Sequence, residues 1–209
     1  MTLVLQVENL NVTLSGTKIL EDIGFNVEAG ALLRFTGRNG AGKSTLLRAI
    51  AGLIPFTGEV LVGGAKPMTL AAKKKTLFVP DEAALYEDLT VLEHAQFVAR
   101  LYEQPQAETQ IQVWLEKFFL RSRLNDLPSE FSRGMRQKLS LSLALGLEAP
   151  LLMLDEPFNA LDQDAQITLG AALEARADAG GCVLFSAHQL DLPMQNASVL
   201  ALENGRLLE

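Results

Sequence analysis

The sequence is poor in cysteine and in basic residues. Cys182 is the only cysteine among 209 residues, which excludes an internal disulfide and a cysteine-rich zinc site. It begins the apolar run 182–185, so we expect a buried structural thiol and a reducing compartment. The net charge of −7 argues against a nucleic-acid-binding groove, because such a groove needs a basic face.

The chain also lacks a recognisable secretory signal and a long uninterrupted apolar run. Residues 1–8 contain no basic region followed by an apolar stretch, so no signal peptide is expected. The most apolar segment, residues 139–154, is interrupted by Glu148 and Pro150 before it reaches membrane-spanning length. This segment predicts a buried helix, a turn and a buried strand. We therefore expect no direct insertion into a membrane.

One glycine-rich segment carries the strongest functional signal. Residues 37–44 match G-x-x-x-x-G-K-[ST], the phosphate-binding P-loop. Its glycines let backbone N–H groups turn inward, Lys43 adds a mobile positive charge, and the Ser44 hydroxyl suits Mg²⁺. An apolar strand at 31–36 precedes the loop, and a helix at 45–51 leaves it with its N-terminus towards the phosphates. The predicted nucleotide-binding residues of this segment are Gly37, Arg38, Asn39, Gly40, Ala41, Gly42, Lys43, Ser44 and Thr45.

The apolar pattern indicates an α/β fold. Alternation at residues 3–8 and 23–28, with a polar turn near Ser15 and Gly16, predicts an antiparallel β subdomain at the N-terminus. Strands separated by helices elsewhere predict a mostly parallel sheet. We predict one domain over residues 1–209, in which a P-loop NTPase core (1–80 and 148–209) carries a helical insertion at about 81–147. The further strands are expected at 58–62, 76–79, 151–154 and 182–185, and a helix at 163–179.

A second apolar strand, 151–154, ends in two carboxylates. If it lies beside the P-loop strand, Asp155 reaches the Mg²⁺ held by Ser44, because Mg²⁺ prefers one or two carboxylates together with phosphates and waters. Glu156 is then placed to polarise a water that faces the γ-phosphate. The alternative is that both carboxylates only end a buried strand.

Three more segments resemble one family. Residues 155–162 (DEPFNALD) resemble the Walker B segment and D-loop of the ATP-binding cassette (ABC) ATPases. Residues 131–138 (FSRGMRQK) resemble their signature motif, and residues 185–188 (FSAH) resemble their switch-histidine loop. With the P-loop, these segments follow the order of the family over essentially the whole chain. The chain is therefore similar to the ATP-binding subunit of an ABC transporter, which implies ATP and Mg²⁺ as cofactors.

The resemblance implies roles for further residues. Glu156 and His188 would be catalytic, with His188 contacting the γ-phosphate and holding Glu156 and the water in line. Ser132, Arg133 and Gly134 would face the γ-phosphate on the P-loop of a second cassette chain, so that ATP lies between two chains. A homodimer is the favoured arrangement. Gly134 is expected to keep side-chain bulk away from that phosphate.

At three places the sequence departs from the family pattern. Leu14 stands where an aromatic residue commonly stacks on adenine, which predicts weaker or less adenine-selective binding. Asp81 stands where glutamine usually follows the proline, and we expect its carboxylate to contact Mg²⁺ or a water on it. Arg133 and Met135 create a Ser-Arg-Gly-Met signature that resembles exporter cassettes, and Arg133 would strengthen the charge contact with the facing phosphate.

The resemblance thus implies an ATP-hydrolysing subunit on the cytoplasmic face of the cell membrane. It would power transport, with export favoured, through an integral membrane permease subunit. The docking groove would lie near residues 81–101, where Tyr86 and Phe97 are candidate interface residues, although helical spacing favours core packing for Phe97.

Two alternatives stay open. One is a soluble cassette ATPase that acts on nucleic acid or the ribosome, which the acidic charge disfavours. The other is a non-hydrolysing regulatory cassette, which Leu14 and Asp81 suggest. The residues that disfavour it are Lys43, Asp155, Glu156 and His188.

Overall fold

The computed structural model describes residues 2–188 and 191–208. Its strands are β1 (Leu3–Leu14), β2 (Thr17–Glu28), β3 (Leu32–Thr36), β4 (Thr57–Val62), β5 (Thr76–Val79), β6 (Leu151–Leu154), β7 (Cys182–Ser186), β8 (Ser198–Glu203) and β9 (Arg206–Leu207). Its α-helices are α1 (Lys43–Ile50), α2 (Leu70–Lys73), α3 (Val91–Leu101), α4 (Ala107–Lys117), α5 (Arg133–Leu145) and α6 (Gln163–Asp178).

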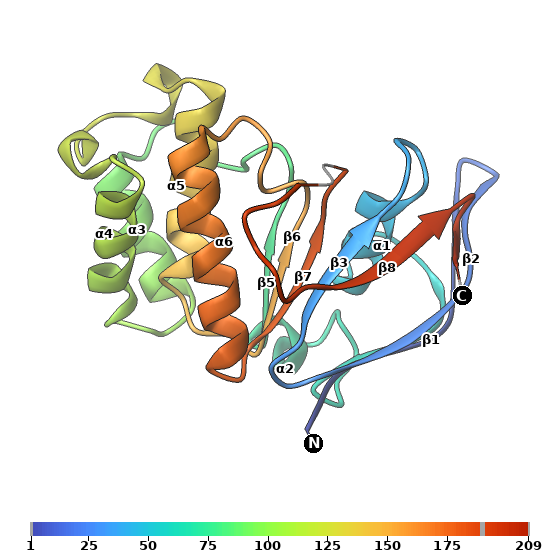
Figure 1. The fold of residues 1–209 in the computed structure, drawn as a ribbon. Helices are drawn as coiled ribbons and strands as arrows, with labels where there is room; N and C mark the ends of the chain where they lie inside the picture. Colours follow the sequence, from blue (N-terminus) through green and yellow to red (C-terminus); the bar gives the residue numbers. More distant parts are fainter. Residues whose placement is uncertain (1, 189–190, 209) are drawn as a thin grey trace.

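The strands form two sheets (Figure 1). An antiparallel sheet has the order β2-β1-β4, and a six-stranded sheet has the order β5-β6-β7-β3-β8-β9. The six-stranded sheet is parallel except for β9, which pairs antiparallel with β8. Helices α3, α4 and α5 gather to one side of the sheets, at the left of Figure 1. The predicted α/β class, with an antiparallel N-terminal sheet and a mostly parallel sheet, is confirmed.

The first two strands are longer than the alternation predicted. Both β1 and β2 run for twelve residues and meet at the turn of Ser15 and Gly16. Their pairing contains register shifts, including one between Val7 and Leu10, and Asn9 has a positive φ of 48°. Such irregularities change which side chain faces the core. The simple period-2 pattern therefore indicated only the parts of β1 and β2 that lie farthest from the turn.

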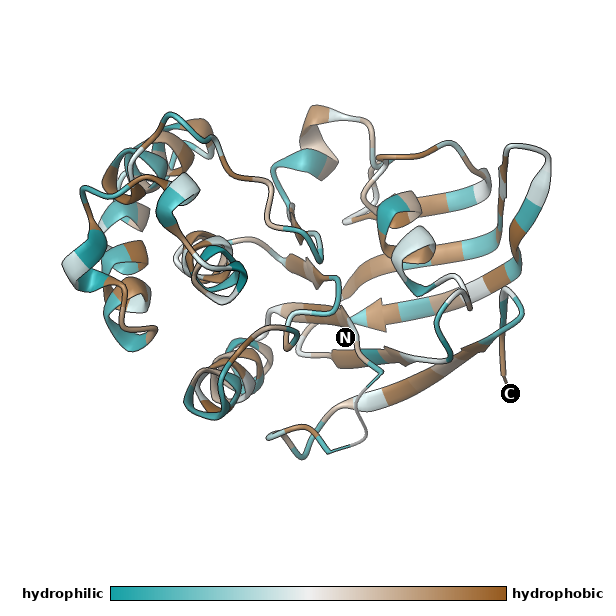
Figure 2. Ribbon diagram, turned by 90° about the horizontal axis from the view of Figure 1, so that it is seen from above, coloured by the Kyte–Doolittle hydropathy of each residue, from teal (hydrophilic) through white to brown (hydrophobic). Residues whose placement is uncertain are grey.

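The centre of the parallel sheet is buried on both faces, and the strongly hydrophobic segments in Figure 2 include its strands. On one face Leu154 and Phe185 pack with α6 and the helical region. On the other face Met153 and Leu184 join the core that contains α1 and the antiparallel sheet. Strands covered on both sides read as continuous apolar runs. Cys182 is fully buried, and burial raises the pKa of its thiol, as expected for a structural residue.

The apolar segment 139–154 forms the predicted elements. Helix α5 ends at Leu145, and the buried strand β6 begins at Leu151 after a short turn. Within residues 2–188 and 191–208, no helix is both long and apolar enough to cross a bilayer.

Helix α3 corrects one prediction about the core. Its capping box at Thr90 and Glu93 is present, and its buried stripe includes Val91, Ala95 and Ala99. Phe97 lies outside this stripe and is 37% exposed, so core packing was the wrong interpretation. Apolar residues at helical spacing lie on two faces of α3, and the buried face carries Val91, His94, Ala95 and Ala99.

Gly146→Ala tests the packing of α5 on α4. A Cβ at this position would lie 2.6 Å from the backbone nitrogen of Ile111, which cannot move without shifting α4. We expect the free energy of unfolding to fall by about 1–3 kcal/mol, measured by urea denaturation. Gly24→Ala is the control, because its Cβ would meet only the Val7 carbonyl oxygen at 3.7 Å. Equal losses in both variants would contradict the close packing.

Candidate functional site

The P-loop connects the end of β3 to the start of α1. Gly37, Gly40 and Gly42 have φ values of 144°, 83° and 106°, which L side chains rarely adopt. Gly42 is the N-cap of α1 and makes no side-chain cap, so this residue leaves the first N–H groups of the helix uncapped. Lys43, Ser44 and Thr45 form the first turn. This arrangement is suited to an anion.

Lys43 lies between the loop and a carboxylate. Its side chain is buried, and its Nζ donates to the Gly37 carbonyl oxygen at 3.0 Å. The same Nζ is 3.5 Å from Oε1 of Glu156. The ammonium group therefore links the P-loop to the end of β6.

Asp155 reaches the P-loop by a route that sequence reasoning did not predict. Ser44 Oγ donates to Asp155 Oδ1 at 2.9 Å, which confirms that these two side chains meet. However, β6 does not lie beside β3, because β7 separates them. The expected adjacency of the two strands was wrong. The order of strands depends on long-range pairing, to which the local sequence of 151–156 gives no guide.

Ser186, at the end of the intervening β7, joins the two carboxylate residues. Its Oγ donates to Asp155 Oδ1 at 2.7 Å and accepts a hydrogen bond from the Glu156 N–H at 2.7 Å. Sequence analysis assigned no role to this serine. Its position two residues before His188, at the end of a buried strand, was the signal that could have indicated one.

Asp155 and Ser44 fit a magnesium ion. Asp155 is almost completely buried, and among the described residues its Oδ2 has no hydrogen-bond partner. A buried carboxylate oxygen without a donor is costly unless a cation or an ordered water meets it. Carboxylate and hydroxyl oxygens are the hard ligands that Mg²⁺ prefers.

Glu156 has a strained backbone and a restrained side chain. Its φ of 47° is uncommon for a residue other than glycine, and such strain often occurs at functional sites. Oε2 lies 2.9 Å from Nδ1 of His188, while Oε1 faces Lys43. The His188 side chain is half exposed, whereas that of Glu156 is mostly buried. The structure thus brings Lys43, Glu156 and His188 together at the P-loop.

The signature segment lies at the N-terminus of α5. Ser132 is the N-cap, and its hydroxyl oxygen accepts from the Met135 N–H at 3.3 Å. A Cβ on Gly134 would lie 2.6 Å from the Ala160 carbonyl oxygen. The close approach of Ala160 therefore already requires a glycine at position 134. The sequence alone did not reveal this reason for the glycine.

Two departures from the family pattern contact each other. Arg133 Nη2 lies 3.5 Å from Asp81 Oδ1, and Asn159 Nδ2 lies 3.5 Å from the same oxygen. Among the described residues, the contacts of Asp81 run to these side chains and not to Ser44 or Asp155. The structure therefore does not bring Asp81 to the expected metal ligands. Leu14, the expected adenine platform, lies at the exposed end of β1.

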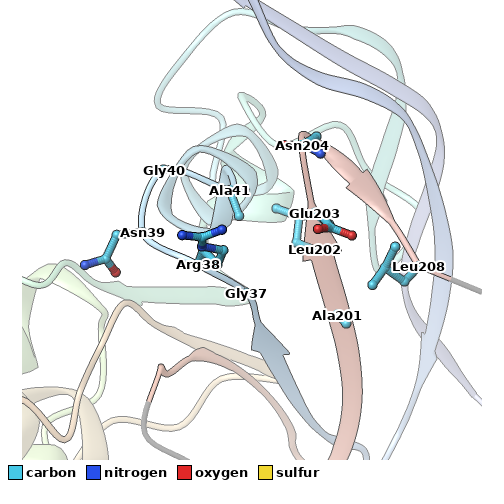
Figure 3. Close-up of a pocket in the computed structure, with 10 residues that line it drawn as sticks. All are labelled: Gly37, Arg38, Asn39, Gly40, Ala41, Ala201, Leu202, Glu203, Asn204 and Leu208. Atoms are coloured by element: carbon cyan, nitrogen blue, oxygen red, sulfur yellow. The ribbon is translucent and has the colours of Figure 1, made fainter.

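A cavity of about 570 Å³ opens beside the P-loop (Figure 3). It lies between the loop and the β8–β9 hairpin, and Figure 3 shows the Asn39 side chain directed away from β8. A Cβ on Gly37 would lie 2.2 Å from the Leu202 carbonyl oxygen, so β8 supports the loop directly. The lining residues are Gly37, Arg38, Asn39, Gly40, Ala41, Ala201, Leu202, Glu203, Asn204 and Leu208.

Comparisons with known proteins agree with this geometry. Residues 20–159 match the family profile described as "ABC transporter". The chain is 32% identical to the SkfA peptide export ATP-binding protein SkfE of Bacillus subtilis, over 98% of this chain and 87% of that protein. It is also 32% identical to the sulfate/thiosulfate import ATP-binding protein CysA of Synechocystis, over 96% of this chain and 58% of that protein.

A solved structure gives the same result for the fold. The structure of an ATP-binding subunit of an ABC transporter superposes with a TM-score of 0.89 at 32% identity, covering 98% of this chain and 88% of that one.

Ser186→Ala tests the link between Asp155 and Glu156. The variant leaves the Glu156 N–H without its acceptor and removes a donor from Asp155. We expect the free energy of unfolding to fall by about 1–3 kcal/mol, measured by urea denaturation. Ser142→Ala is the matched control, because this buried hydroxyl donates only to the Lys138 carbonyl oxygen one turn earlier in α5. If the control lost as much stability, the Ser186 hydroxyl would stabilise the protein no more than an ordinary buried hydroxyl.

Proposed function

Because this chain belongs to the ABC transporter family, as an ATP-binding and ATP-hydrolysing subunit, we propose that it powers export through a separate integral membrane subunit, with Mg²⁺ as cofactor. The observation that carries the catalytic part of the proposal is the placement of Glu156 between Lys43 and His188 at the P-loop. A carboxylate held there is suited to accept a proton from a water that attacks a phosphate.

Each residue of the cluster has a distinct task in the proposed reaction. The P-loop N–H groups and Lys43 bind the phosphates of ATP. Glu156 accepts a proton as the water oxygen bonds to the γ-phosphorus and the bond to the β-phosphate oxygen breaks, giving ADP and phosphate. His188 orients the Glu156 carboxylate. Mg²⁺ bound through Ser44 and Asp155 would neutralise charge on the phosphate oxygens.

Export is favoured over import by two observations. The relative named for peptide export is matched over most of its own length, whereas the relative named for sulfate import is matched over little more than half. The Ser132–Arg133–Gly134–Met135 signature also resembles that of exporter cassettes. The proposed cargo direction is therefore outward.

A surface on α3 and the preceding loop fits a membrane partner. Tyr86 is 55% exposed, and its ring packs edge-on against Phe97 with 5.3 Å between the ring centroids. Leu101, on the same helix, is 63% exposed. Exposed aromatic and aliphatic groups of this kind typically mark a protein interface. We propose that the permease docks here and holds this chain on the cytoplasmic face of the membrane.

A second copy of the chain is the proposed partner at the nucleotide. Ser132 leaves the N-terminus of α5 exposed, and Arg133 beside it is 67% exposed. A helix N-terminus with a nearby guanidinium group attracts phosphate. We propose that this end of α5, with Gly134, meets the γ-phosphate on the partner's P-loop in a homodimer, with no nucleic acid involved.

Glu156→Gln tests the catalytic assignment. The amide keeps the shape of the side chain but cannot accept the proton, so we expect steady-state phosphate release to fall by about 10²–10⁴-fold. ATP binding, measured by equilibrium titration, should persist. Glu59→Gln, at an exposed position of β4, is the control and should retain full activity. Equal rates for wild type and Glu156→Gln would remove the assignment, and an inactive wild type would favour a regulatory cassette.

Affinity capture from detergent-solubilised native membranes tests the transport role. We expect tagged protein to recover a stoichiometric multi-span membrane protein, identified by mass spectrometry. Tyr86→Glu combined with Phe97→Asp should reduce this recovery at least tenfold, because charge would replace the exposed apolar surface. Ile167→Asp, at a 51% exposed position on α6, is the control. Recovery only of ribosomal or nucleic-acid partners from the soluble fraction would retain the ATPase chemistry and overturn transport.

A further inference from the structure

The connection from β7 to β8 is short for a crossover between two parallel strands. Both strands are parallel to β3, which lies between them, so residues 187–197 must cross over β3. A parallel crossover typically needs about a dozen residues or more and usually contains a helix. Among the described residues of this connection, 187–188 and 191–197, none is helical. His188 lies at its beginning.

Helix α6 contacts the crossover and binds some of its backbone N–H groups, which in a crossover helix would be bonded within the helix. Oε1 of Glu174 accepts from the backbone N–H of Gln195 at 2.8 Å and from that of Asn196 at 3.3 Å. One turn earlier, a Cβ on Gly170 would lie 2.3 Å from the Pro193 carbonyl oxygen. The crossover therefore lies against α6 at two points, and Figure 1 shows it extending towards this helix before it enters β8.

A buried cation lies beneath the same segment. Arg34 of β3 is only 8% exposed and lines a small cavity of about 90 Å³ together with Leu192, Met194 and other crossover residues. Burial lowers the pKa of Arg34, whereas the negative charge of Glu156 raises it. Arg34 therefore lies under the described part of the crossover.

The two ends of the crossover are thus fixed differently. At the β7 end, the Ala187 N–H donates to the Phe35 carbonyl oxygen at 3.1 Å. At the β8 end, the carboxylate of Glu174 binds the chain. His188 lies between these anchors, and its Nδ1 must stay within hydrogen-bond distance of Glu156 to orient it. Release of the second anchor would remove the hydrogen bonds that hold Gln195 and Asn196 to α6.

We propose that Glu174 is a positioning residue of the ATPase: by binding the crossover to α6 it holds His188 against Glu156. The proposal rests on the proposed function of this site. Glu174 touches no reacting atom, and its effect is on how often the His188–Glu156 contact is formed. ATP binding by the P-loop does not depend on it.

Three variants test this role in the full-length protein. Glu174→Ala removes the acceptor, and we expect kcat for ATP hydrolysis to fall about tenfold while KM for ATP stays within twofold. Glu174→Gln keeps an oxygen acceptor and should restore most of kcat. Gly170→Ala raises the helix propensity of α6, but its Cβ would clash with the Pro193 carbonyl oxygen. It should therefore lower kcat while KM for ATP stays within twofold. Asp178→Ala, at an exposed acidic residue of α6, is the control.

Hydrogen–deuterium exchange gives a readout that does not need catalysis. We expect the amides of Gln195 and Asn196 to exchange at least tenfold faster in Glu174→Ala than in wild type and Asp178→Ala. Unchanged exchange, unchanged kcat, or equal loss in the Ala and Gln variants would each overturn the positioning role. A wild type without ATPase activity would instead overturn the proposed function and the positioning role together, whereas exchange would still show whether the anchor exists.

Discussion

The site depends on the register of three parallel strands. Phe35 of β3 pairs with Ser186 of β7, and Leu154 of β6 pairs with Phe185 of β7, so the carboxyl ends of all three strands reach one edge. Side chains alternate between the faces of a sheet, so a slip of one residue would turn Ser186 away from Asp155. Both faces of these strands are close-packed, so a slip would also press side chains of the wrong volume into the cores on the two faces.

Around that edge, each polar group is shared between segments that are distant in the sequence. The Ser186 hydroxyl is hydrogen-bonded to Asp155 and to the backbone of Glu156. The Glu156 carboxylate contacts both Lys43 and His188. Movement of any of these segments would therefore disturb the others. The strained φ of Glu156 is maintained because the neighbouring contacts fix both its backbone and its side chain.

Two departures from the family pattern contact each other. Asp81 and Arg133 form an ion pair with each other, although exposed pairs of this kind contribute only about 0–1 kcal/mol. In the crossover after His188, whose described part contains no helix, Glu174 accepts hydrogen bonds from the N–H groups of Gln195 and Asn196. In both places a residue of one segment contacts a residue of another that is distant in the sequence.

The sequence by itself determined the α/β class, the P-loop and the carboxylates that end a buried strand, because these features depend on neighbouring residues and on the periodicity of short segments. Only the tertiary structure decided that β7 separates β6 from β3, and that Ser186 and Glu174 support the site. It also placed Phe97 on the surface. These features arise from contacts between residues far apart in the chain, and local patterns contain no information on which distant segments pair.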